Sequence, residues 1–342
     1  MSSNETNEYS ESDTLNVPIS GVEVTTAVKR LKNGKACGED NIINEMSRAF
    51  SENHLNMLTQ IFNVVLLSGH IPNDWLIGII KPIYTNKGDI NNPDNYRGIT
   101  LLSCLGKLFT SIINKRLTAF INSKQIMSEA QAGFRKGYST TDQIFTLKCI
   151  VELFLCQGRR LFCTFVDYSK AFDSINRAML WKKLISYGVS GKVFNVILNM
   201  YKSIKSCVMN NGVQSELFES HVGLRQGENL SPLLFALFLN DLETFFPVQK
   251  WNTLKFIDKL YNDSNGGISG MLNMFVLLYA DDTVIMAENE SDMQRNLDLL
   301  NEYCICNKLK VNISKTKMLV FARSKTRIRN IRTFKFGDIS WN

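Results

Sequence analysis

Two adjacent carboxylates, Asp281 and Asp282, stand between two strand-like runs and constrain the fold more than any other feature of the chain. The run before them, residues 274–278, is apolar, and the run after them, residues 283–286, is rich in β-forming side chains. Such runs with a short connection predict a β-hairpin with both carboxylates at its tip. Aspartate also favours turns for local hydrogen-bonding reasons, so this pair alone does not identify a metal site.

A second acidic position, Asp167, ends another apolar run, residues 162–166, and precedes a helical pattern. If this run pairs with the hairpin in one sheet, Asp167 and Asp281 come close together although they are distant in sequence. Paired carboxylates suit Mg²⁺, which takes one or two carboxylates together with waters and substrate phosphates. The sequence therefore predicts a two-metal site for phosphoryl transfer.

Further segments carry a resemblance to a known family. In chain order the six are residues 95–102 (NYRGITLL), 131–137 (QAGFRKG), 165–173 (FVDYSKAFD), 223–232 (GLRQGENLSP), 279–282 (YADD) and 312–317 (NISKTK). The chain resembles the reverse transcriptases of non-long-terminal-repeat (non-LTR, LINE-type) retrotransposons from about residue 21 to its C-terminus. One motif arises easily by chance, whereas six in the family's order do not.

The resemblance implies an α+β fold with the fingers and palm of a right-hand polymerase, the palm carrying a ferredoxin-like antiparallel sheet. We expect a disordered tail over residues 1–15, a helical extension over 16–74 and a reverse transcriptase domain over 75–342. Within that domain the fingers cover about 75–155 and the palm about 156–342. The family's primer grip and helical thumb follow the palm, and we expect this chain to stop before them, so that the thumb is missing.

Hydrophobic periodicity and capping residues place the main elements. We expect strands at 77–84, 96–102, 162–167 and a final pair within 310–321, and helices at 46–67, 105–120, 139–156, 177–187 and 192–202, with further helices beginning at Ser231 and Ser291.

The resemblance also implies roles at the metal site. Asp167 and Asp281 would bridge two Mg²⁺ ions, with Mn²⁺ as the alternative cation, and Asp282 would be a third, less fixed carboxylate. Lys315 or Lys317 would protonate the leaving pyrophosphate, and the sequence does not choose between them. Asp173 is expected to be structural, because aspartate favours the first turn of a helix.

The same resemblance implies that five residues bind the incoming nucleotide: Lys87, Arg97, Phe172, Gln226 and Gly227. A guanidinium at Arg97 suits phosphate oxygens, while Lys87 competes with Lys81 for the same role. The ring of Phe172 would exclude a 2′-hydroxyl and so select deoxynucleotides, unless it is an ordinary core side chain. Gln226 and Gly227 would lie beside the nascent base pair, and the neighbouring Arg225 is interpreted as a surface charge.

The composition is compatible with a polyanionic partner. The net charge is +7 with a pI near 8.9, and the basic residues cluster at 29–35, 81–116 and 308–335, the helix at 105–120 carrying Lys107, Lys115 and Arg116 on its polar face. The apolar run 233–239 is too short to span a membrane, so no membrane partner is expected.

The function expected from the sequence is RNA-directed DNA polymerisation. Its partners would be an RNA template, a DNA primer or nicked target DNA, and deoxynucleoside triphosphates, inside the cell in a ribonucleoprotein of nucleus or cytoplasm. The endonuclease and thumb of the longer element polyprotein are expected to be absent from this chain. The alternative is an inactive element remnant that only binds RNA or hybrid.

Overall fold

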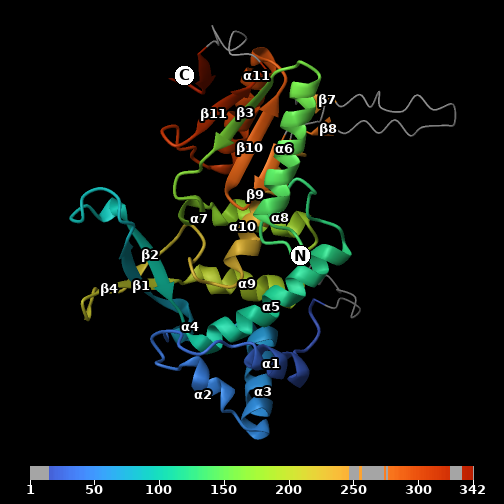
Figure 1. Cartoon of the computed structure of the whole chain (residues 1–342). Coiled ribbons are helices and arrows are strands. Elements are labelled where there is room, and N and C mark those ends of the chain that lie inside the picture. The colour runs from blue at the N-terminus through green and yellow to red at the C-terminus, as the bar shows by residue number, and fades with distance from the viewer. Residues whose placement is uncertain (1–14, 246–253, 256–272, 275, 324–332, 342) are drawn as a thin grey trace, which may run out of the picture. The chain divides into compact units, whose positions relative to one another are not determined.

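The computed structural model describes residues 15–245, 254–255, 273–274, 276–323 and 333–341 (Figure 1). The chain divides into two units, which we call unit 1 (residues 1–126 and 176–234) and unit 2 (residues 127–175 and 235–342). Almost all of the predicted tail and a large part of the basic cluster 308–335 lie outside the described residues. Leu15 is buried, so the packed part of the chain already includes that residue.

Unit 1 combines a helical layer with a mixed sheet. Its helices are α1 (Gly21–Lys29), α2 (Asn44–Arg48), α3 (Glu52–Ser68), α4 (Asn73–Leu76), α5 (Cys104–Ser123), α8 (Arg177–Ser186), α9 (Gly191–Lys202) and the start of α10 (Ser231–Leu239), with a 3₁₀ turn at Pro93–Asn95. Its strands are β1 (Ile77–Tyr84), β2 (Tyr96–Leu101), β4 (Lys205–Asn210), β5 (Val213–Gln214) and β6 (Phe218–Glu219).

The sheet of unit 1 is organised around β1. This strand pairs antiparallel with β2, so that Ile79 lies opposite Leu101, and parallel with β4 on its other side. Three aromatic rings from α3, α4 and α5 form the nearby core: Phe62, Trp75 and Phe109, with ring centroids 5.3 to 6.0 Å apart. The predicted hairpin of strands 77–84 and 96–102 is therefore confirmed.

Unit 2 is built on an antiparallel sheet flanked by helices. Its elements are α6 (Thr140–Cys156), β3 (Leu161–Val166), α7 (Ala171–Ser174), the remainder of α10, β7 (Leu254–Lys255), β8 (Asn273–Met274), β9 (Val276–Tyr279), β10 (Asp282–Ala287), α11 (Glu290–Asn307), β11 (Lys317–Phe321), β12 (Phe334–Phe336) and β13 (Ile339–Trp341). The four main strands lie in the order β11-β3-β10-β9, and all three pairings are antiparallel. This is the antiparallel sheet that the sequence predicted.

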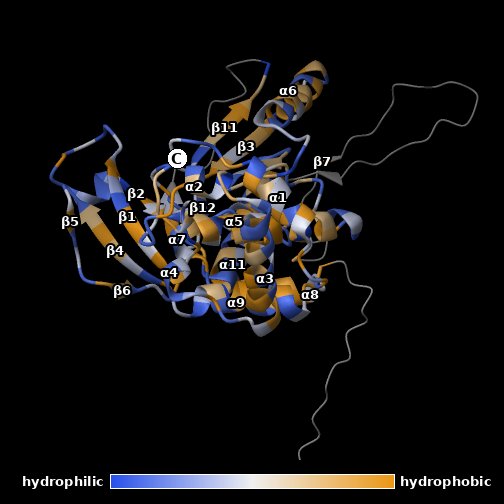
Figure 2. Ribbon diagram, turned by 90° about the horizontal axis from the view of Figure 1, so that it is seen from below, coloured by the Kyte–Doolittle hydropathy of each residue, from blue (hydrophilic) through white to orange (hydrophobic). Residues whose placement is uncertain are grey.

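The central strand β3 is covered on both faces. Cys163 packs with Ile150 and Phe154 of α6 in one apolar cluster, while Thr164 on the other face contacts Met293 of α11, with Oγ1 3.3 Å from Sδ. A strand buried on both faces needs a nearly continuous apolar sequence, as Figure 2 shows for β3. This burial explains why residues 162–166 read as a strand without alternation.

Helix boundaries follow local capping chemistry. The Ser139 hydroxyl accepts a hydrogen bond from the Asp142 amide, and the Asp142 carboxylate accepts one from the Ser139 amide. This capping box starts α6 where the sequence predicted a helix. The predicted helix at 46–67 is instead two helices, α2 and α3, because Ser51 takes an extended conformation and starts a new helix. Helix α11 begins at Glu290, one residue before the predicted start at Ser291, because the Asn289 side chain caps it. The final strand pair is reduced to β11 and a single bridge at Val311.

Within the described residues, no helix combines the length and apolar character that crossing a membrane requires.

The sequence interpretation of Arg116 as part of an open basic face is wrong. Arg116 is buried and joins α5 to α1: its Nε lies 2.7 Å from Glu23 Oε1, and Nη2 donates to Glu23 Oε2 and Pro18 O. Hydrogen bonding from Arg116 is the main cause that lowers the pKa of Glu23 to about 2, against the opposing effect of burial. The guanidinium thus fixes the N-terminal segment on the helical layer.

Glu23→Gln should lower the free energy of unfolding at pH 7 by about 1–2 kcal/mol, after allowing for partial exposure of the carboxylate. Because the folded pKa lies below the unfolded one, the stabilisation is complete above about pH 5 and is lost as the pH falls toward 2. Urea denaturation of both proteins between pH 7 and pH 3 measures the difference. Glu39→Gln, at an exposed carboxylate in the same unit, is the control; a gap that does not shrink on acidification contradicts the ion pair.

Candidate active site

The register of two strands brings the predicted carboxylates of unit 2 together. Thr283 of β10 lies opposite Val166 of β3, so the next positions outward along this antiparallel pair are Asp282 and Asp167. Asp282 also pairs with Tyr279, leaving Ala280 and Asp281 as a two-residue turn. Asp281 is therefore at the hairpin tip, as predicted, and Asp282 is the first residue of the returning strand.

The pKa of Asp282 reflects its burial and the two neighbouring carboxylates. Burial is the main cause that raises the pKa of Asp282, and the negative charges of Asp281 and then Asp167 raise it further. Among the described residues, no three acidic, histidine or cysteine side chains already converge around the position of a metal ion. An open set of carboxylate oxygens nevertheless fits Mg²⁺, which keeps several waters and takes phosphate oxygens from a substrate.

Neighbouring segments of unit 2 hold the backbone at this end of the sheet. The Asp167 amide donates to Thr316 Oγ1 at 3.2 Å, and the Asn312 amide donates to Asp167 O at 2.7 Å. Residues 312 and 316, both within the motif 312–317 identified in the sequence, thus fix the end of β3.

The turn at Ala280 has a support that the sequence reading missed. Gln131 is fully buried, and its Oε1 accepts from the amides of Ala280 at 3.1 Å and Gly133 at 2.8 Å. Ala280 has a φ of 59°, and a Cβ on Gly133 would lie 2.1 Å from the Ala280 nitrogen. The sequence showed this glutamine as part of the motif 131–137. That it supports the turn at Ala280 is visible only from its hydrogen bonds to residues distant in sequence.

In unit 1, the β1–β2 hairpin presents two exposed cations on one face. Arg97 lies opposite Ile83 and Lys81 lies opposite Ile99, and cross-strand partners share a face of the sheet. Lys87, by contrast, lies in the connection after β1 and is also exposed. The geometry therefore places Lys81 beside Arg97 on the strands, and the choice between Lys81 and Lys87 stays open.

Gln226 and Gly227 lie in the loop between β6 and α10. Gly227 has a φ of +97°, and a Cβ there would lie 2.8 Å from the carbonyl oxygen of Thr100 in β2. Glycine is required because the backbone is left-handed and also touches the neighbouring strand. Gln226 is half-buried.

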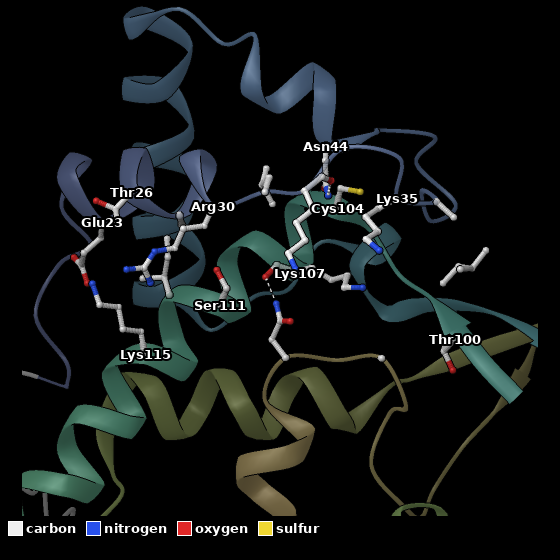
Figure 3. Close-up of a pocket in the computed structure, with 18 of the residues that line it drawn as sticks. Glu23, Thr26, Arg30, Lys35, Asn44, Thr100, Cys104, Lys107, Ser111 and Lys115 are labelled. Carbon is white, nitrogen blue, oxygen red and sulfur yellow. Dashed lines mark hydrogen bonds between the residues drawn. The ribbon is translucent and has the colours of Figure 1, made fainter. Parts of the chain in front are cut away.

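A basic pocket of about 490 Å³ adjoins this loop in unit 1. Its cations come from two separate sequence clusters: Arg30, Lys32 and Lys35 at and beyond the end of α1, and Lys107 and Lys115 on α5 (Figure 3). Asn229 binds the carbonyl of Lys107 at 2.7 Å and so links the loop to α5. Among the described residues that line the pocket, Glu23 is the one acidic side chain, and it is already bound to Arg116. The pocket therefore suits an anionic ligand.

Comparison with known proteins decides the family. A family model described as "Reverse transcriptase (RNA-dependent DNA polymerase)" matches residues 85–336, well over half of the chain. The chain belongs to the reverse transcriptase family.

Curated relatives of this reverse transcriptase narrow the resemblance to mobile elements. It is 26% identical over 331 residues to the "RNA-directed DNA polymerase from mobile element jockey" of Drosophila melanogaster, covering 92% of this chain and 33% of that protein. It is 24% identical over 313 residues to the "Retrovirus-related Pol polyprotein from type-1 retrotransposable element R2" of Popillia japonica, covering 90% and 40%.

A further match is the "Probable RNA-directed DNA polymerase from transposon X-element" of Drosophila melanogaster, 27% identical over 227 residues, which covers 66% of this chain and 25% of that protein. The chain thus spans between a quarter and two fifths of the length of these relatives. The resemblance to the reverse transcriptases of non-LTR retrotransposons, predicted from six motifs, is confirmed.

The remaining predicted residues of this reverse transcriptase take distinct positions in unit 2. Phe172 is half-buried and stacks on Phe235, with ring centroids 4.5 Å apart, while Phe134 meets it edge-on at 6.4 Å. Lys315 and Lys317 are both exposed, and Lys317 Nζ donates to Ser314 O at 2.8 Å. The roles of Phe172 and of either lysine stay predictions.

One interpretation of the loop is corrected. Arg225, expected to be a surface charge, is buried, with 6% of the residue exposed. Its guanidinium lies within unit 1 against the end of α4 and the first residues of β1. No local sequence pattern predicts this contact, because the two segments are distant in sequence.

Proposed function

We propose that this chain carries the nucleotidyl-transfer centre of a non-LTR retrotransposon's RNA-directed DNA polymerase. The observation that carries the proposal is the strand register, which sets Asp167 beside Asp282 where β3 and β10 meet, with Asp281 at the adjoining hairpin tip. The 3′-hydroxyl of a DNA primer or nicked target DNA attacks the α-phosphorus of a deoxynucleoside triphosphate, and pyrophosphate leaves. An RNA template selects the nucleotide. We place this activity inside the cell, in a ribonucleoprotein of nucleus or cytoplasm.

The chemistry of the donor set supports this assignment. Two Mg²⁺ ions, or Mn²⁺ as the alternative, would supply a deprotonated attacking hydroxyl and charge neutralisation on the phosphates. Asp167, Asp281 and Asp282 would hold these ions through carboxylate oxygens. Burial and the charges of Asp281 and Asp167 disfavour the ionised form of Asp282 and raise its pKa, so a bound cation would relieve an unfavourable interaction there as well as taking part in catalysis.

The names fingers and palm belong to this proposal. The antiparallel sheet of β11, β3, β10 and β9 corresponds to a polymerase palm, and the β1–β2 hairpin to fingers. On the hairpin, Arg97 with Lys81 or Lys87 offers cations for triphosphate oxygens. Gln226 and Gly227 would accompany the nascent base pair.

We assign the basic pocket of unit 1 to the sugar–phosphate backbone of single-stranded template RNA. Within the described part of the chain, five cations line it and the single lining carboxylate, Glu23, is already paired with Arg116. The pocket also adjoins Gly227. Flexible lysines tolerate any sequence, as a template site requires, because backbone contacts carry no sequence information.

Primer extension on an RNA template with Mg²⁺ tests the activity. Asp281→Asn should reduce extension by on the order of a hundredfold or more, because it removes a metal ligand, while template–primer affinity changes less than about threefold. Asp298→Asn, an exposed aspartate of α11 in the same unit, is the control. Wild-type protein that binds template–primer but never extends it would favour the alternative of an inactive binding module.

The pocket is tested with Lys107→Glu and Lys115→Glu, compared with Lys182→Glu at an exposed position on α8 that does not line it. Each pocket variant should weaken binding of template–primer with a single-stranded RNA extension and lower the slope of log K against log salt by about 0.7 per lost contact. Blunt duplex should bind unchanged. Equal losses with Lys182→Glu, or with blunt duplex, would remove the pocket from the template path.

Sugar selection is the expected role of Phe172. Phe172→Val should raise the kcat/KM for ribonucleotides relative to deoxynucleotides by roughly tenfold or more, because it frees space for a 2′-hydroxyl. Phe134→Ala serves as the control, since it removes an aromatic neighbour of Phe172 and leaves the ring itself in place. If both variants shift the ratio equally, or neither does, Phe172 acts in packing and not in sugar selection.

A further inference from the structure

Arg225 joins two segments of unit 1 that are distant in sequence. Its Nη1 donates to Trp75 O at 2.9 Å and its Nη2 donates to Leu76 O at 3.2 Å. These residues end α4, which leads directly into β1 (Figure 1). The carbonyls of a last helical turn have no partners inside the helix, so the guanidinium satisfies groups that the chain would otherwise leave open.

The strands of the hairpin are shaped to receive this loop. A Cβ on Gly78 of β1 would lie 3.3 Å from Arg225 Nη2 and 2.6 Å from a methyl group of Thr100. Two residues past Arg225, the backbone of Gly227 reaches the carbonyl of Thr100 on β2. The loop therefore touches both strands of the hairpin. A glycine makes room at each contact: Gly78 on β1 faces Arg225, and Gly227 in the loop faces Thr100 on β2.

The rest of the loop is held by buried polar groups. Ser231 Oγ donates to Arg225 O at 2.7 Å, and Glu228 accepts from Thr110 Oγ1 and from the Asn229 amide. At the beginning of the loop, Arg177 donates from Nε to Gly223 O at 2.8 Å. These bonds fix the loop on both sides of Gln226.

Burying the positive charge of Arg225 costs free energy, so this arginine needs a reason other than stability. Burial lowers the pKa of Arg225, with Glu228 and Tyr201 acting in the opposite direction. Within the described part of the chain, no carboxylate forms a direct ion pair with it, and its Nε has no hydrogen-bond partner. An apolar side chain of similar volume often stabilises a protein more than a buried cation does, so stability alone is a poor reason for this arginine.

We propose that Arg225 is a positioning residue that locks the Gln226–Gly227 loop onto the β1–β2 hairpin, so that loop and hairpin move as one body. This inference rests on the proposed function in one respect: the two segments joined are those assigned to the base pair and to the triphosphate. Loss of the link should loosen nucleotide binding without removing the metal site, because Asp167, Asp281 and Asp282 belong to unit 2.

Hydrogen exchange tests the link without requiring activity. In the 342-residue protein, Arg225→Met should speed exchange in peptides covering 224–230 and 76–82 together. Arg116→Met is the matched control: it removes a buried arginine of the same unit that also binds backbone carbonyls, and should affect only the contacts between α1 and α5. Faster exchange confined to 224–230, or no change in either segment, would overturn the proposal.

Kinetics supplies the second readout, at saturating template–primer. Arg225→Met should raise the KM for deoxynucleoside triphosphates on the order of tenfold and change kcat less than about threefold, whereas Arg116→Met should leave KM unchanged. An unchanged KM in an extending Arg225→Met enzyme would overturn the positioning role. A wild-type protein that does not extend primers would instead refute the proposed function, and the exchange experiment would still decide the link.

A conservative variant covers the case in which Arg225→Met does not fold. Arg225→Lys keeps the charge but replaces the two-pronged donor with a single ammonium, so its exchange and KM should lie between those of wild type and the methionine variant. Values identical to wild type would show that charge alone suffices and would overturn the requirement for two carbonyl contacts.

Discussion

The antiparallel pairing of β3 with β10 is the constraint on which the candidate site depends. Asp167 follows the last residue of one strand and Asp282 begins the other, so their approach is set by register and not by either residue alone. A shift of one residue would turn every side chain of a strand to the opposite face of the sheet. Burial of β3 on both faces, against α6 and α11, makes such a shift costly because the packed side chains differ between the faces.

This register concentrates negative charge, and in the described part of the chain no basic side chain forms an ion pair with Asp167, Asp281 or Asp282. The raised pKa of Asp282 records the burial and the repulsion from its two neighbours. Repulsion of this kind persists only where the surrounding structure enforces it, here through Gln131 beneath the hairpin turn and Thr316 beside Asp167. The site is therefore held ready for a cation by neutral hydrogen bonds that do not compete for the carboxylates.

Three buried arginines join segments within unit 1. Arg116 joins α1 to α5, Arg177 holds the start of the 223–232 loop, and Arg225 joins that loop to the hairpin. Two of them, Arg177 and Arg225, bind mainly backbone carbonyls, which lets one side chain satisfy several loop groups at once. Residues of α1, α5, β2 and the 223–232 loop line the basic pocket, and Arg116 and Arg225 hold these elements in place.

The sequence by itself determined the local structure and the family. Strand 162–166, the hairpin at 279–282, the cap at Ser139 and the helix start at Ser231 were predictable because each depends on neighbouring residues. The six ordered motifs identified the reverse transcriptase family for the same reason, since each is a short local pattern.

Only the tertiary structure decided which charged residues are buried and which distant segments meet. Arg116 and Arg225 look like surface cations in the sequence, and they are buried because partners 93 and 150 positions away accept their hydrogen bonds. Gln131 beneath Ala280 and the meeting of two lysine clusters in one pocket have the same origin. Burial of a polar group depends on partners that the fold supplies, and no local pattern states where those partners will be.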